Sequence, residues 1–127
     1  MTETDKAEVV QKFETGLRNA DVSLLKSVVT DDIVWTLPGK SLMSGEAHGV
    51  DAIMKRSELL QQYGVKIEVQ HVVFGYQDIA VRLHNTGTRG DKILDEYLVT
   101  VFRFRENKIY RAETFLSDVD MLNAFFA

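Results

Sequence analysis

The sequence predicts one α+β domain, in which helices cover one face of a sheet that closes with a four-stranded antiparallel meander. Hydrophobic residues recur with helical spacing through most of the first half of the chain, and with strand spacing after residue 64. The helix–strand alternation that builds a doubly wound parallel sheet is absent from the second half. A chain of 127 residues with 45% hydrophobic residues can bury one core, so residues 1–127 are expected to form a single domain.

Three helices are predicted in the first half of the chain. Residues 5–18 carry apolar side chains at spacings of one, three and four, which is typical of an amphipathic helix. Asp21 suits the N-cap of a second, shorter helix that extends to Val29. The helical pattern returns over Val50–Tyr63 and ends at Gly64, a residue type that favours the position after a helix.

Five strands are predicted. The first covers residues 33–37 and ends before Pro38, and residues 39–48 are expected to form a loop. Four further strands are separated by turns that contain glycine, asparagine or aspartate. They are expected at residues 65–74, 79–84, 93–105 and 109–116, before a last helical turn or two through Phe126.

The composition excludes several classes of protein. A formal charge of −4 and scattered Lys and Arg residues argue against a nucleic-acid-binding surface. The chain has no cysteine, and its three histidines lack the spacing of a metal motif, so we expect no metal and no cofactor. No segment has the length of a membrane span, and the polar N-terminus lacks the apolar core of a signal peptide, so a cytoplasmic location is expected.

Four segments carry a resemblance to a known family. They are the opening helix EVVQKFETGLRNAD, the stretches LLKSVVTDDIVWTLPG and SGEAHGVDAI, and the closing stretch EYLVTVFRFRENKIYRAETFLSD. Their order and spacing resemble the nuclear-transport-factor-2-like superfamily, which includes ketosteroid isomerases and SnoaL-like polyketide cyclases. The resemblance covers essentially the whole chain. It implies a cone-shaped fold, whose strongly curved, mostly antiparallel sheet wraps around the N-terminal helices and encloses a largely apolar pocket.

The resemblance also bears on steroid isomerisation. Ketosteroid isomerases use a tyrosine, an aspartate base and a second acid, and the corresponding positions here are Phe13, Leu37 and Thr100. None of these three residues supplies the required functional group. Because proton abstraction needs a positioned base, steroid isomerisation by that mechanism is not expected.

Cyclase-like and epoxide-hydrolase-like relatives carry a carboxylate on the last strand, where this chain has Glu113 and Thr114. Our alignment points Thr114 into the pocket. A slip of one residue would turn Glu113 inward instead, because strand side chains alternate between the two faces. The sequence leaves this choice open.

Three residues are candidates for acid–base catalysis, namely His84, Glu96 and Glu113. His84 shares a strand face with Arg82, and this face lines the pocket or points to solvent. The apolar residues that alternate with them favour solvent. Glu96 lies across the same hairpin and can pair with either residue, and an acid–histidine pair would be a functional candidate only inside the pocket.

The ligand is expected to contact mostly apolar and hydroxyl side chains. Trp35, the only tryptophan, is expected to lie either at the pocket mouth or in the core. The predicted lining consists of Phe13, Trp35, Leu37, Thr100, Phe102, Thr114 and Leu116.

Alternation along residues 93–105 predicts an apolar outer face of the sheet. If the even-numbered residues face the pocket, Val99 and Val101 lie on the opposite side. An exposed apolar patch of this kind is a natural dimer surface, and relatives commonly dimerise through it. We therefore expect a homodimer that forms through the outer sheet face.

Two functional hypotheses follow from the sequence. The first is a cofactor-independent isomerase, cyclase or hydrolase that acts on a small hydrophobic substrate. The second is a non-catalytic domain that binds a small apolar ligand or acts as a dimeric interaction module. An ionisable side chain that points into the pocket with a perturbed pKa would favour the first hypothesis.

Overall fold

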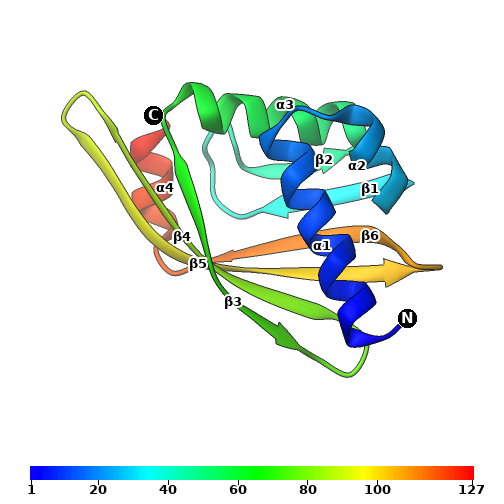
Figure 1. Ribbon diagram of the computed structural model, residues 1–127. Helices are drawn as coiled ribbons and strands as arrows, with labels where there is room; N and C mark the ends of the chain where they lie inside the picture. The colour runs from blue at the N-terminus through cyan, green and yellow to red at the C-terminus, as the bar shows by residue number, and fades with distance from the viewer.

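The computed structural model describes all 127 residues and places helices against one face of a six-stranded, curved sheet (Figure 1). The helices are α1 (Glu3–Arg18), α2 (Val22–Val28), α3 (Gly49–Gln62) and α4 (Val119–Phe125). The strands are β1 (Val29–Leu37), β2 (Gly45–His48), β3 (Lys66–Phe74), β4 (Ile79–Arg89), β5 (Lys92–Arg105) and β6 (Lys108–Leu116). The predicted α+β fold class is confirmed. None of the helices combines the length and the apolar composition needed to cross a membrane.

Side-chain caps fix where three of the helices begin. Thr2 and Asp5 form a capping box at the start of α1, in which each side chain accepts a backbone hydrogen of the other residue. Asp21 caps α2 by accepting a hydrogen bond from Leu24 N. Asp118 caps α4 by accepting a hydrogen bond from Met121 N. These caps satisfy backbone donors that a helix leaves free in its first turn.

The strands are ordered β2-β1-β6-β5-β4-β3 across the sheet. Neighbouring strands are antiparallel except β1 and β6, which run parallel. Strands β3 to β6 form the meander that the sequence predicts, and β1 returns to pair with the last of them.

Two details of the sequence prediction around β1 are wrong. Residues 45–48, predicted as part of a loop, form the short edge strand β2, which pairs with residues 34–37 of β1. The segment Gly-Glu-Ala-His has no alternation to indicate a strand, because Ala47 is its only buried residue. Val29 begins β1 instead of ending α2, since its backbone pairs with that of Ile109 in β6.

The pairing of β4, β5 and β6 decides which side chains face the helices. Even-numbered residues of β5 are buried from Leu94 to Phe102, whereas the odd-numbered residues between them are partly or fully exposed. Thr100 lies opposite both Val81 and Thr114, so these side chains share the inner face. We call the helix-facing side of the sheet the inner face and the opposite side the outer face.

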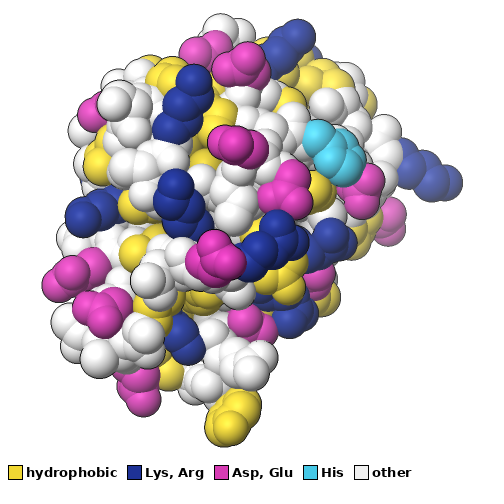
Figure 2. Space-filling view, turned by 90° about the vertical axis from the view of Figure 1, so that its right-hand side faces the viewer, with side chains coloured by type: hydrophobic (Ala, Val, Ile, Leu, Met, Phe, Trp, Pro, Cys, Tyr) yellow, Lys and Arg dark blue, Asp and Glu magenta, His cyan; other side chains and the backbone are white.

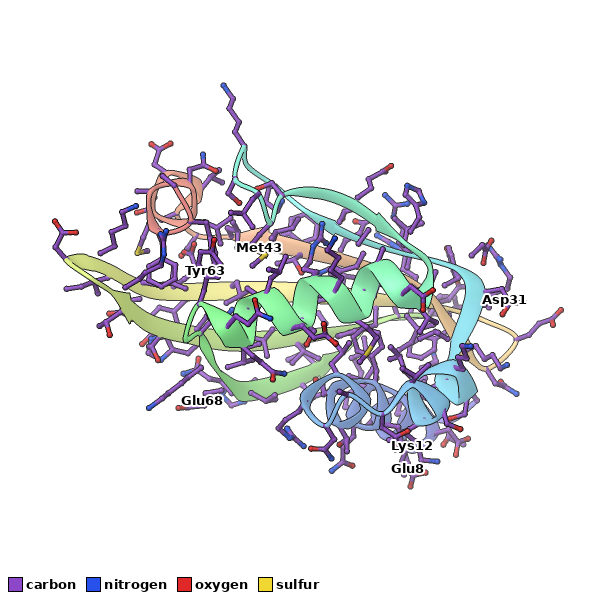
Figure 3. The ribbon with its side chains drawn as sticks, turned by 90° about the horizontal axis from the view of Figure 1, so that it is seen from above. Glu8, Lys12, Asp31, Met43, Tyr63 and Glu68 are labelled. Atoms are coloured by element: carbon purple, nitrogen blue, oxygen red, sulfur yellow. The ribbon has the colours of Figure 1, made fainter.

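The apolar core consists of two separate clusters. The first joins α1, α2 and the start of α3 to the sheet and includes Phe13 and Ile53. The second joins α4 and the end of α3 to the sheet, and Figure 3 shows Met43 and Tyr63 of this region between those two helices. Leu98 is buried on the inner face but belongs to neither cluster. Trp35 is partly buried and packs against both clusters, so it connects them.

Edge strand β3 extends beyond the cover of the helices. Ile67 and Val69 pair with Asn85 and Leu83 of β4 and share the inner face with them. Both remain exposed, and Ile67 keeps 54% of its surface accessible. The inner face is thus open to solvent on this side of the sheet.

Candidate functional site

A pair of threonine hydroxyls lies at the centre of the inner face. Thr100 in β5 and Thr114 in β6 are directly opposed and only 6% and 5% exposed. Their Oγ1 atoms are 2.9 Å apart, and Trp35 Nε1 donates to Thr114 Oγ1 over 3.0 Å. Thr100 and Thr114 are called the threonine pair below.

The threonine pair has one donor hydrogen more than the protein uses. Each hydroxyl carries a single hydrogen and can accept more than one hydrogen bond. One hydrogen joins the two oxygens, and the indole hydrogen of Trp35 occupies a lone pair of Thr114. The remaining hydroxyl hydrogen has no acceptor within the protein, so the pair can donate to an oxygen atom of a ligand.

Arg56 brings a buried positive charge to the same region. It projects inward from α3, is 7% exposed, and donates to Trp35 O at 2.7 Å and to Gly45 O at 3.0 Å. Its guanidinium also lies 4.9 Å from the centre of the Trp35 ring. Burial lowers the pKa of Arg56 to about 10, which leaves the group protonated at neutral pH. No carboxylate forms an ion pair with Arg56, so only the two backbone carbonyls and the indole ring offset its positive charge.

Glu96 is the one predicted acid–base residue on the inner face. It is 1% exposed, and its Oε2 accepts hydrogen bonds from Ser117 Oγ at 2.5 Å and Asp118 N at 3.0 Å. Its Oε1 has no hydrogen-bond partner. Burial raises the pKa of Glu96 above its ordinary value, although the two hydrogen bonds to Oε2 oppose that rise.

His84 lies on the outer face, away from the threonine pair. Its ring stacks on Tyr97 with a centroid distance of 4.2 Å, and its Nε2 is 2.5 Å from Asp95 Oδ1. The guanidinium of Arg82 covers the same tyrosine ring. The partner of His84 is therefore Asp95, whose side chain points outward, and not Glu96.

Glu113 also lies on the outer face, because Thr114 is the residue of β6 that turns inward. Its Oε1 lies 2.6 Å from Arg111 Nε and 3.7 Å from Arg103 Nε. The hydrogen bond from Arg111 is the main reason that the pKa of Glu113 is lowered. The three predicted acid–base residues thus do not converge, since only Glu96 faces inward.

The predicted lining residues occupy the inner side of the molecule. Phe13 and Phe102 meet edge to face with centroids 5.4 Å apart. Trp35 is partly buried and packs against both apolar clusters, so it bridges the region between them. Leu37 is buried and Leu116 is partly buried, both in or against the second cluster.

Two polar residues that point into the interior, Arg56 of α3 and Asn85 of β4, are not among the residues predicted from the sequence. Arg56 lies on the buried stripe of α3 together with Ile53 and Leu60, and a charged residue on such a stripe is a usable signal. Asn85 alternates in phase with Val81 and Leu83, but it falls beyond the predicted end of its strand. The longer course of β4 brings its side chain inward.

Hollows elsewhere on the surface are weaker candidates for a binding site than the inner face. One shallow hollow lies beside α1, where Glu8 and Lys12 point away from the sheet (Figure 3), and another lies where α2 approaches the start of α3. Both are lined mainly by polar and charged side chains and do not include the threonine pair.

No three His, Asp or Glu side chains converge in the arrangement of a metal site. Acidic and basic side chains are interspersed on the face in Figure 2, without a continuous basic patch.

Comparisons with known proteins identify the domain. Residues 10–112 match the model of the SnoaL-like domain. Bal32a, from a soil-derived mobile gene cassette, aligns with a TM-score of 0.86 and 23% identity over 98% of both chains. TerC, co-crystallised with polyporic acid, aligns with a TM-score of 0.78 and 16% identity over 97% of this chain and 99% of its own. A proposed SnoaL-like polyketide cyclase from Jannaschia sp. CCS1 aligns with a TM-score of 0.75 and 16% identity over 98% of this chain and 94% of its own. No curated protein matches the sequence.

The bond from Trp35 to Thr114 predicts unequal effects of two isosteric substitutions. Thr114→Val leaves the indole N–H without its acceptor, so we expect a loss of about 1–3 kcal/mol in the free energy of unfolding. Thr100→Val removes only the bond between the hydroxyls, with an expected loss of about 0.5–1.5 kcal/mol. Urea denaturation measures both, and an equal or larger loss for Thr100→Val would contradict this arrangement.

Proposed function

Because the chain belongs to the SnoaL-like family of the nuclear-transport-factor-2-like superfamily, we propose that it binds a small, mainly apolar molecule on the inner face of its sheet. The observation that carries the proposal is the unused donor hydrogen of the buried threonine pair. A buried donor without an acceptor is costly, and a ligand oxygen removes that cost. Co-crystallisation of TerC with polyporic acid supports the use of this fold for an organic ligand.

The ligand is a molecule with an apolar body and an acceptor oxygen such as a carbonyl. The oxygen accepts the free hydrogen of the threonine pair. The positive charge of Arg56, whose guanidinium lies over the Trp35 ring that donates to Thr114, favours partial negative charge on this oxygen. Leu83, Leu98 and Leu116 form one row across the sheet next to the threonine pair and contact the apolar body. Burial of this surface supplies most of the binding free energy.

The geometry favours binding over acid–base catalysis on such a ligand. Glu96 is four residues from Thr100 along β5, a separation of about 13 Å at roughly 3.3 Å per residue. A base must lie within hydrogen-bond reach of the proton that it removes, and the α-hydrogens of a ketone lie only about 3 Å from its oxygen. Glu96 therefore lies too far away to act next to a carbonyl that the threonine pair holds.

Binding is tested with 1-acetylnaphthalene and 1-ethylnaphthalene, which have nearly the same shape but differ in the carbonyl group. We expect both to raise the melting temperature, since a ligand at a hundred times its Kd stabilises the folded state by about 2.7 kcal/mol. The ketone should bind about twofold to tenfold more tightly, as one hydrogen bond contributes about 0.5–1.5 kcal/mol.

The triple variant Thr100→Val/Thr114→Val/Trp35→Phe is the matched control for the carbonyl contact. Trp35→Phe is included because the loss of Thr114 would leave the indole N–H free to donate to the ketone. The triple variant should bind both compounds with equal affinity, because none of the three replacements donates a hydrogen bond. The proposal fails if neither compound stabilises the wild-type protein. The role of the threonine pair fails if the preference for the ketone is absent or survives in the triple variant.

We further propose that the protein forms a homodimer through the outer face. Val99 pairs with Phe115 across β5 and β6, and Phe115 keeps 54% of its surface exposed. Tyr97 and Val101 extend this apolar surface along β5. A second copy of the chain would bury the patch under a two-fold axis, as closed oligomers usually do.

The dimer is tested by light scattering during gel filtration. The wild-type protein should elute with twice the monomer mass of 14.4 kDa, and Phe115→Lys should elute as a monomer. Ile67→Lys is the control, because Ile67 is equally exposed but lies on the inner face of edge strand β3. A monomeric wild-type protein, or a dimer that Phe115→Lys leaves intact, would contradict the proposed interface.

A further inference from the structure

The second polar site of the inner face consists of Asn85 and Glu96. They are directly paired across β4 and β5, and both side chains face inward. Side chains that are opposed in this way on one face have Cβ atoms about 5 Å apart, so their ends lie within contact distance. The pair adjoins the apolar row at Leu83 and Leu98, on the side away from the threonine pair.

Two buried acceptor atoms of this pair have no hydrogen-bond partner. They are Asn85 Oδ1 and Glu96 Oε1. The other carboxylate oxygen of Glu96 is already occupied by Ser117 Oγ and Asp118 N. Buried acceptors almost always have a donor, and no donor of the protein reaches these two in the structure. A single donor group from outside the protein would satisfy both.

The number and type of these atoms select the chemistry of the donor. A ketone or an ether brings no hydrogen, and an alcohol brings one, which serves only one of the two acceptors. A primary ammonium group brings three hydrogens and a positive charge, and hydrogen bonds that involve a charged partner are the stronger ones. No ion pair occupies Glu96, and an ammonium group beside it would favour its ionised form, which counteracts the rise in pKa that burial causes.

We propose that Asn85 and Glu96 bind the primary ammonium group of a ligand whose apolar body lies on Leu83 and Leu98. This inference rests on the proposed function, since it places the ligand on the same inner face. The ammonium group donates to Glu96 Oε1 and Asn85 Oδ1. A single ligand reaches both the ammonium site and the threonine pair if its nitrogen and its acceptor oxygen are about 13 Å apart, the length of four residues of β5.

The experiment compares 1-naphthylmethylamine, 1-naphthalenemethanol and 1-methylnaphthalene, which carry three, one and no donor hydrogens at pH 7. We expect the amine to bind at least tenfold more tightly than the hydrocarbon, with the alcohol between them, by isothermal titration calorimetry. Without acceptors to replace its hydration, an ammonium group would instead bind an apolar surface less tightly than the hydrocarbon does.

Two single substitutions, each of which removes one carboxylate charge, distinguish binding of the amine at Glu96 from a general attraction of the amine to an acidic protein. Glu96→Gln should reduce amine affinity at least tenfold and leave hydrocarbon affinity unchanged. Asp95→Asn changes the neighbouring residue on the outer face, so it should leave the order of the three affinities as it is in the wild type. If Glu96→Gln does not fold, Asn85→Ala replaces it, with an expected loss of several-fold for the amine alone.

The outcomes distinguish this inference from the proposed function. If the hydrocarbon binds and the amine binds no better, the inference is overturned and the proposed function stands. The open acceptors are then served by a buried water or by a turned Asn85 amide. An amine preference that survives in Glu96→Gln also overturns the inference. If none of the three compounds binds, the inference fails, and the result with 1-acetylnaphthalene and 1-ethylnaphthalene decides whether the proposed function fails as well.

Discussion

The register of β5 against its two neighbours is the constraint on which the rest of the structure depends. Pairing with β4 and β6 sends Glu96, Leu98 and Thr100 toward the helices, while Tyr97 and Val99 point the other way. A shift of one residue would exchange these two sets, because side chains alternate along a strand. The same register therefore creates both the polar groups of the interior and the apolar patch of the outer face. Ligand binding and dimerisation are proposed for opposite sides of one strand, and they do not compete for residues.

Burial of polar groups in the interior has a cost that the protein offsets only in part. Arg56 is satisfied by backbone carbonyls, and one oxygen of Glu96 is held by Ser117 and Asp118. The threonine pair retains a free donor, and Glu96 retains a free acceptor. These unpaired groups flank Leu98, which lies outside both apolar clusters. A domain selected for stability alone would place apolar side chains at such positions, since unpaired buried polar groups destabilise it. Their presence agrees with an interior that is completed by a ligand.

The sequence predicts the fold better than the site, for physical reasons. Helical and strand periodicity are local, so they locate α1, α3 and the meander without knowledge of the tertiary structure. The edge strand β2 depends on backbone pairing with β1, which leaves no pattern in its own side chains. Alternation shows that Glu113 and Thr114 face opposite ways but not which of them faces inward, and the contacts of β6 with β5 decide this. Similarly, the choice of Asp95 rather than Glu96 as the partner of His84 depends on which face of β5 the histidine shares.

The most direct test of this account is the location of a bound ligand. Methyl groups of leucine and valine can be followed by NMR during titration with 1-acetylnaphthalene, since an aromatic ring shifts the resonances of methyls that it covers. The account predicts the largest shifts at Leu83, Leu98 and Leu116, with little change at Val99 and Val101 on the outer face. Shifts that are largest on the outer face, or that spread over the surface without including Leu98, would contradict it.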